Sequence, residues 1–223
     1  MTLTIDSPAV SGVLEQLFAA EAAQNEELEA RAAKLQGHLT FDHSLCEELT
    51  DAFLAVDRRV GRFLYTLVRS HRPTIVVEFG TSFGVSALHL AAALRDNGSG
   101  RLITAEIQRN KAEASGAHLE SAGLADLVDI RVGDALESLR DVEGPIDLVL
   151  LDGWPNVYLP LLRMLEPRLQ PGAIVLADDL PRGGPVPPDT LAEFYAYVRD
   201  PRHGYATAAL TIGDGVEFCV RTR

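Results

Sequence analysis

Five short, uninterrupted apolar runs between residues 74 and 177 constrain the fold more than any other feature of this chain. The runs are residues 74–79, 102–107, 128–132, 146–151 and 173–177. Strands buried on both faces of a parallel sheet have this continuous rather than alternating pattern. Segments of helix length separate the runs, so the pattern predicts successive βαβ units. A chain of 223 residues suits one large α/β domain better than two.

The segments between and after these runs complete the predicted architecture. Helices are expected at residues 85–95, 109–122, 135–140, 157–169 and 188–198. Two further strands, 205–212 and 216–221, flank Gly213, Asp214 and Gly215, which is a hairpin signal. We therefore expect a mostly parallel, Rossmann-like α/β sheet that ends in an antiparallel hairpin strand.

Residues 1–70 are predicted to form a helical N-terminal extension of the same domain, ahead of the main part at 71–223. Apolar residues recur at helical spacing from Val13 to Leu35. A second apolar stripe from Cys46 to Leu67 predicts one continuous helix. Packing onto the sheet is the simpler role for both helices. A lid or a dimer arm is the functional alternative, and the helices permit a homodimer without demanding one.

The charge balance excludes several partners. Twenty Lys and Arg against 32 Asp and Glu give a formal charge of -12, which repels phosphate backbones and anionic membranes. The N-terminus lacks a basic, apolar leader, and no run approaches the roughly 20 apolar residues of a membrane span. We therefore expect a cytoplasmic protein that binds neither nucleic acid nor membrane. Cys46 and Cys219 lack metal-type spacing, which favours reduced, buried thiols.

A glycine-rich stretch from Glu78 to Ser86 joins the first predicted strand to a helix. Gly80 allows a tight turn and close approach of a ligand, and Gly84 allows close packing at the start of the helix. The spacing is not the GxGxxG of dinucleotide binders, which disfavours a nicotinamide dehydrogenase, nor is it a phosphate loop. A turn that binds no ligand is the simpler alternative.

Polar residues after the next two strands suit a nucleoside. Glu106 ends the second strand, where it can accept hydrogen bonds from both hydroxyls of a ribose. Gly133, Asp134 and Ala135 follow the third strand, where they can contact an adenine edge. Each acid could instead cap a helix. However, acids at the ends of three successive strands, namely Glu78, Glu106 and Asp134, favour an adenosine site. Lys111, in the helix after Glu106, is expected to face solvent.

A second group of acids follows the fourth and fifth strands. Asp152 ends one strand, and Asp178 and Asp179 end the next. Neighbouring strands lie about 4.8 Å apart, so these carboxylates can converge at one sheet edge. Left bare they would repel one another, whereas a hard divalent cation such as magnesium or calcium would neutralise them. Alternatively, Asp179 caps the next segment and only Asp152 contacts a ligand.

Residues 61–180 resemble the class I S-adenosylmethionine-dependent methyltransferases, and among them the metal-dependent O-methyltransferases of the catechol O-methyltransferase type. The matching stretches are 77–80 (VEFG), 84–87 (GVSA), 102–107 (LITAEI), 151–154 (LDGW), 158–160 (YLP) and 176–179 (LADD). The resemblance implies S-adenosylmethionine as cofactor and a seven-stranded sheet with its last strand inserted antiparallel.

The same resemblance implies roles for individual residues. The glycine-rich turn would hold the methionine part of the cofactor, Glu106 the ribose, and the residues around Asp134 the adenine. The residues expected to bind the cofactor are Glu78, Gly80, Ser82, Gly84, Ser86, Glu106, Ile107, Gly133, Asp134, Ala135, Asp152 and Trp154. Asp152, Asp178 and Asp179 are expected to bind magnesium, and Asp152 is the candidate catalytic residue.

The implied reaction is methyl transfer to a hydroxyl of a small, catechol-like molecule. A metal that chelates two adjacent hydroxyls lowers the pKa of one. The resulting oxyanion, held in line with the sulfonium methyl group, takes that group directly and releases the thioether as the leaving group. Catechol O-methyltransferase has a lysine base after the tryptophan, where this chain has Pro155; His38 and His43 are candidate replacements. The alternatives are a metal-independent methyltransferase of this fold and a cofactor-binding partner protein without catalysis.

Overall fold

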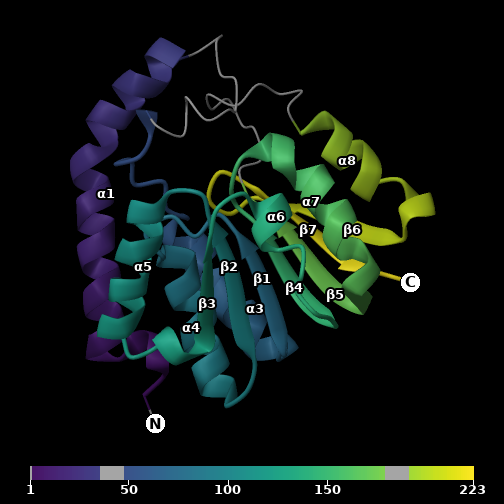
Figure 1. The fold of residues 1–223 in the computed structure, drawn as a ribbon, viewed down its shortest axis with the longest axis horizontal. Helices are drawn as coiled ribbons and strands as arrows, with labels where there is room; N and C mark the ends of the chain where they lie inside the picture. Colours follow the sequence, from purple (N-terminus) through teal and green to yellow (C-terminus); the bar gives the residue numbers. More distant parts are fainter. Residues whose placement is uncertain (1, 36–47, 179–190) are drawn as a thin grey trace.

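The structure is a computed structural model that describes residues 2–35, 48–178 and 191–223. Its strands are β1 (Ile75–Phe79), β2 (Arg101–Glu106), β3 (Val128–Val132), β4 (Ile146–Leu151), β5 (Leu169–Ala177), β6 (Tyr205–Leu210) and β7 (Val216–Arg221). Within these residues they form one seven-stranded sheet in the order β3-β2-β1-β4-β5-β7-β6 (Figure 1). The first five strands pair in parallel, and β7 is antiparallel to both β5 and β6. The predicted Rossmann-like sheet is therefore confirmed.

Helices cover both faces of the sheet. They are α1 (Pro8–Leu35), α3 (Arg58–His71), α4 (Val85–Asn97), α5 (Arg109–Ser121), α6 (Ala135–Ser138), α7 (Tyr158–Leu165) and α8 (Ala192–Val198), with 3-10 turns η1 (Thr4–Asp6), η2 (Ala125–Leu127), η3 (Pro155–Val157), η4 (Glu166–Arg168) and η5 (Pro201–His203). Helices α1, α3, α4 and α5 pack on one face, and α6, α7 and α8 on the other. Successive strand residues such as Val76 and Val77 enter opposite cores, which explains the uninterrupted apolar runs.

Most predicted boundaries agree with the structure, and the exceptions have local causes. The predicted hairpin is confirmed, because Tyr205–Leu210 pairs along Val216–Arg221. β5 begins earlier than expected because Leu169 pairs with Ile146 before a shift in register. The helix predicted at 157–169 ends at Leu165, ahead of the proline-containing turn η4. Cys219 is a buried free thiol, as expected, and Cys46 lies outside the described residues.

The prediction of one continuous helix from Cys46 to Leu67 is wrong. α3 begins only at Arg58, and residues 52–57 have no helical structure. Asp57 has an extended ψ of 145°, and its carboxylate accepts a hydrogen bond from the Arg59 amide, so it is the N-cap of α3. Val56 is nevertheless buried in the core, because the extended segment packs its apolar side chains inward.

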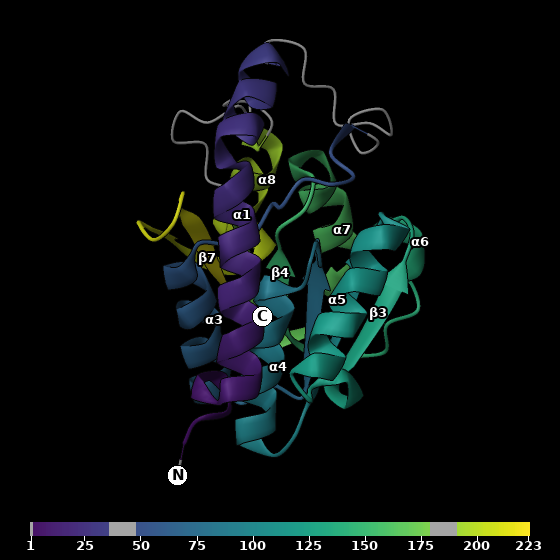
Figure 2. The same cartoon turned by 90° about the vertical axis from the view of Figure 1, so that its left-hand side faces the viewer.

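The turn η1, just before the long helix α1, is attached to α4, which is also bonded to α3 at the same residue. The Thr4 hydroxyl donates to Asp96 Oδ1 at 2.6 Å, and the Tyr65 hydroxyl donates to Asp96 Oδ2 at 2.6 Å. Buried apolar residues of α1, among them Val10 and Leu17, join the core beneath. Figure 2 shows α1 running along the molecule beside α3 and α4. In the described part of the chain, no helix combines the length and apolar character that a bilayer span requires.

Candidate functional site

The glycine-rich turn after β1 is pressed against the end of β4. The Gly80 amide donates to the Ala105 carbonyl at 3.1 Å, and the Asp152 amide donates to the Phe79 carbonyl at 2.9 Å. Gly80 has a φ of +101°, and a Cβ at this position would lie 2.2 Å from the Asp152 main-chain oxygen. Only glycine meets both conditions, as the sequence predicted for a tight turn.

Glu106 links this turn to the neighbouring strands. Its Oε2 accepts a hydrogen bond from the Ser82 amide at 2.7 Å, and its Oε1 accepts one from the Gln108 amide at 2.9 Å. Ser82 itself has a φ of +47°, which turns its amide back toward the carboxylate. The Gly133 amide donates to the Glu106 carbonyl at 2.9 Å, so the turns after β1, β2 and β3 meet at one residue.

Glu78 is a fully buried carboxyl group at the end of β1. Its Oε2 accepts a hydrogen bond from the Thr104 hydroxyl at 2.5 Å. Burial raises the pKa of Glu78 to about 7, against hydrogen bonds from Ser86 and Thr104 that favour the charged form. Its Oε1 and the Ser82 Oγ are buried and have no hydrogen-bond partner within the described ranges.

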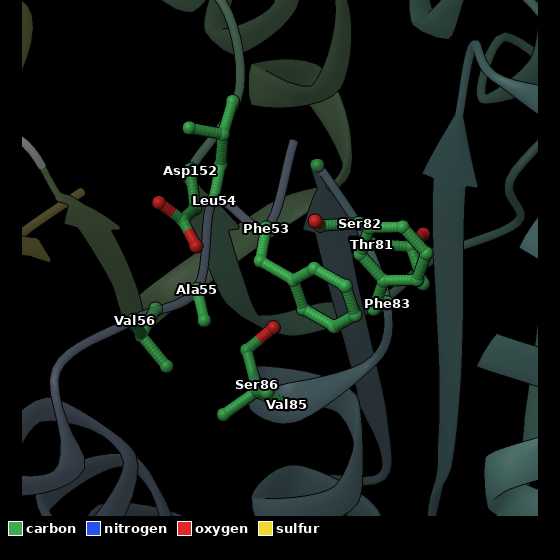
Figure 3. A pocket seen from close by; sticks show the side chains of 11 residues that line it. Phe53, Leu54, Ala55, Val56, Thr81, Ser82, Phe83, Val85, Ser86 and Asp152 are labelled. Carbon is green, nitrogen blue, oxygen red and sulfur yellow. The ribbon is translucent and has the colours of Figure 1, made fainter. Parts of the chain in front are cut away.

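A cleft that is open to solvent lies over this turn (Figure 3). One side is lined by turn residues, including Gly80, Ser82 and Ser86, together with Asp152. The other side is residues 53–56, which were not among the residues predicted to bind the cofactor. The Phe53 ring stacks on the Phe83 ring, with centroids 4.0 Å apart and planes 13° from parallel. The capping pattern at Asp57 is the sequence signal that could have separated this segment from α3.

The prediction that Lys111 faces solvent is wrong. Its side chain is only 5% exposed, and its Nζ lies 5.5 Å from the centroid of the Phe83 ring. The aliphatic stem can be buried while the ammonium group lies over an aromatic face, which compensates part of the desolvation cost. The predicted cofactor region is therefore bordered by a buried cation.

The turn after β3 is built as a helix cap. Asp134 is exposed, and its Oδ1 accepts a hydrogen bond from the Leu136 amide at 2.8 Å, which caps α6. Gly133 has a φ of +128°, and Ala135 is buried. Ile107, after β2, is an exposed apolar residue at the same sheet edge. The capping role that was an alternative for Asp134 is thus present.

Asp152 and Asp178 lie side by side at the ends of β4 and β5. Each follows a paired residue, since Leu151 is in register with Ala177, and the Asp178 amide donates to the Leu151 carbonyl at 2.9 Å. Asp178 is buried and Asp152 is half-buried. Asp179, His38 and His43 lie outside the described residues, and within those residues no group of three metal-ligating side chains occurs. Half-buried Trp154 packs against the core on the face of the sheet that α6, α7 and α8 cover.

The strand order and the site together define a class of protein. Five parallel strands end at β5, and β7 is inserted antiparallel between β5 and the edge strand β6. A glycine turn follows β1, and a fixed carboxylate ends β2. This combination is that of the class I methyltransferases.

Comparisons with known proteins identify the family. A family model described as a methyltransferase domain matches residues 77–180. Catechol O-methyltransferase of Mus musculus is 35% identical over 147 residues, which are 62% of this chain and 52% of that protein. Its counterpart in Sus scrofa is 35% identical over 133 residues, 56% of this chain and 70% of that protein. The chain belongs to the class I S-adenosylmethionine-dependent O-methyltransferases.

Similarity to a solved structure extends over most of the chain. The O-methyltransferase TomG from Streptomyces achromogenes, in complex with S-adenosylmethionine, has a TM-score of 0.68 and 26% identity, covering 86% of this chain and 95% of that chain. By contrast, the match spans only about half the length of the mouse relative, at 52%.

Proposed function

We propose that this protein transfers a methyl group from S-adenosylmethionine to a hydroxyl of a small, catechol-like aromatic molecule, assisted by a divalent cation. The observation that carries the proposal is the hydrogen bond from the Ser82 amide to Glu106, because it fixes a carboxylate beside the glycine-rich turn. Relatives named catechol O-methyltransferase support the class of acceptor.

The residues around the turn suit this cofactor. The buried Glu78 Oε1 and Ser82 Oγ lack partners among the described residues, and such atoms are costly unless a ligand satisfies them. Gly80 keeps the backbone open to close approach. We assign the positively charged methionine end to Glu78 and the turn, the ribose to Glu106, and the adenine side to Ile107.

The acids at the ends of β4 and β5 suit a divalent cation. Carboxylate oxygens are the ligands that magnesium prefers, and we assign them to Asp152, Asp178 and Asp179. When bound, the cation would lower the pKa of an acceptor hydroxyl. Asp152 also lines the cleft, so the chain would hold the acceptor and the methyl donor next to each other.

A metal-independent O-methyltransferase is the second candidate, and Pro155 favours it. Pro155 is buried at the start of η3, where the catechol enzyme has its lysine base. Proline has no titratable group, so the chain supplies no base at this position. The acceptor would then have to be acidic on its own, or be deprotonated by a group elsewhere such as His38 or His43.

Calorimetric titration of S-adenosylhomocysteine into the protein tests the cofactor site. We expect Glu106→Ala to weaken binding about 10- to 100-fold, because two hydrogen bonds to a charged group are lost. Glu113→Ala, an exposed acid on α5, is the matched control and should bind normally. Equal affinity of Glu106→Ala and the wild type would contradict the assignment. Binding without methyl transfer to any catechol would favour a non-catalytic partner protein.

Titration of magnesium into the protein saturated with S-adenosylhomocysteine tests the metal site separately. Binding should be lost in Asp178→Asn and Asp179→Ala and kept in Asp214→Asn, an exposed acid in the hairpin loop. Absence of magnesium binding in the wild type, with the nucleoside still bound, would reject the metal and leave the metal-independent candidate.

A further inference from the structure

We propose that Gln24 of α1 is a positioning residue for the cofactor cleft. It fixes residues 50–56, here called the wall segment, over the glycine-rich turn. The inference rests on the proposed function, because it takes the cleft to receive the cofactor. It assigns a role in that site to α1, although none of the described lining residues belongs to this helix.

The side-chain amide of Gln24 holds the wall segment at two points. Its Nε2 donates to the Asp51 carbonyl at 3.2 Å, and its Oε1 accepts from the Phe53 amide at 3.1 Å. Both bonds are made to main-chain atoms, so they fix the path of the backbone whatever the side chains are. The primary amide matches this pair because it carries a donor and an acceptor side by side.

The segment held in this way is continuous with the cleft. Phe53, next to the clamp, stacks on Phe83 of the glycine-rich turn, and residues 53–56 form one side of the opening. Asn110 of α5 donates to the Thr50 carbonyl at 2.9 Å and adds a second attachment. Ala52 and Val56 are buried at either side of Phe53. The contacts therefore lead from α1, through the wall segment, to the turn.

Contacts to α3 and α4 anchor α1 ahead of the clamp. Its start is fixed through the bonds of Thr4 to Asp96, and Glu15 pairs with Arg58 at the beginning of α3. The wall segment runs directly into α3, so both of its ends are anchored while its middle has no helix or sheet hydrogen bonds. Without Gln24, we expect the middle to sample more conformations, and ligand binding would then have to order it.

The test compares Gln24→Ala, Gln24→Glu and the control Gln16→Ala, an exposed residue of the same helix. We expect Gln24→Ala to raise the Kd for S-adenosylhomocysteine roughly 5- to 30-fold, the equivalent of two ordinary hydrogen bonds. Gln24→Glu keeps the acceptor for Phe53 but turns a carboxylate oxygen toward the Asp51 carbonyl oxygen, so it should also weaken binding. The apo thermal midpoints, measured in parallel, separate this effect from general destabilisation.

A double-mutant cycle with Phe53→Ala tests whether Gln24 acts through the wall segment. In the Phe53→Ala background the fold-change caused by Gln24→Ala should shrink. An unchanged Kd in Gln24→Ala, with normal binding by the wild type, would overturn the inference. If the wild type binds no nucleoside, the proposed function fails instead. Hydrogen exchange then tests the clamp alone, because the Phe53 amide, which donates to Gln24, must exchange faster in Gln24→Ala than in Gln16→Ala.

Discussion

The main-chain oxygen of Asp152 lies where a side chain on Gly80 would begin, since a Cβ there would come within 2.2 Å of it. The turn after β1 and the end of β4 are therefore in direct backbone contact. Any side chain at Gly80 must therefore push the ends of β1 and β4 apart. The proposed cofactor site lies at the first of these ends, and the proposed metal site lies at the second.

Gly80→Ala should consequently destabilise the fold by about 3 kcal/mol, from an unfavourable φ together with overpacking. Cofactor binding should be lost as well. Gly98→Ala is the control, because Gly98 also has a positive φ but meets nothing within 4 Å, so it should cost about 1 kcal/mol. Denaturant unfolding measures both variants. Equal losses would show that backbone conformation alone, and not contact with Asp152, requires glycine at position 80.

His89 should make stability depend on pH in the acid range. Burial lowers its pKa to about 4, and its Nδ1 lies 2.8 Å from the Val85 carbonyl. An unfolded histidine titrates near pH 6.5, so below that pH the unfolded chain takes up a proton that the folded protein excludes. Stability should be full above pH 6.5 and fall by about 3 kcal/mol in total between pH 6.5 and 4.

Replacement of His89 checks this assignment. His89→Gln should flatten the pH dependence of unfolding in that window. His118→Gln removes a histidine that also contacts a carbonyl, with Nδ1 at 3.0 Å from Phe83 O, but which is only partly buried. It should keep the wild-type profile. A profile that is the same in His89→Gln and the wild type would assign the acid sensitivity to other groups.

Glu78 should make the free energy of unfolding fall as pH rises, which is the opposite of the effect of His89. Its pKa rises from 4.5 to about 7 because of burial, so the folded protein keeps a proton that the unfolded chain releases. Stability of the ligand-free protein should therefore decline as pH rises from 4.5 to 7, by about 3 kcal/mol at most. Glu78→Gln should remove the decline, and Glu113→Gln on α5 should not. The check is the free energy of unfolding of both variants and the wild type, measured between pH 4.5 and 7.

The apolar pattern predicted the sheet because strands such as β1 and β4 must bury both faces, which leaves a local signature. The glycine turn was predictable for the same reason, since Gly80 is required by backbone geometry. The wall segment was not, because Phe53 and Val56 continue the spacing of α3 while their partners, Gln24 and Phe83, lie elsewhere in the sequence. Lys111 was misplaced similarly, since its burial depends on an aromatic ring in another element.

The placement of β7 between β5 and β6 has a consequence for synthesis of the chain. β5 is complete at Ala177, yet the partner on its free edge is residues 216–221. During translation the growing sheet must therefore expose an unpaired edge strand until almost the whole of this sequence has been made. If translation pauses after β5, the unpaired edge of this strand in the nascent chain can pair with strands of neighbouring chains. We therefore expect the chain to depend on chaperones mainly between the synthesis of β5 and that of β7.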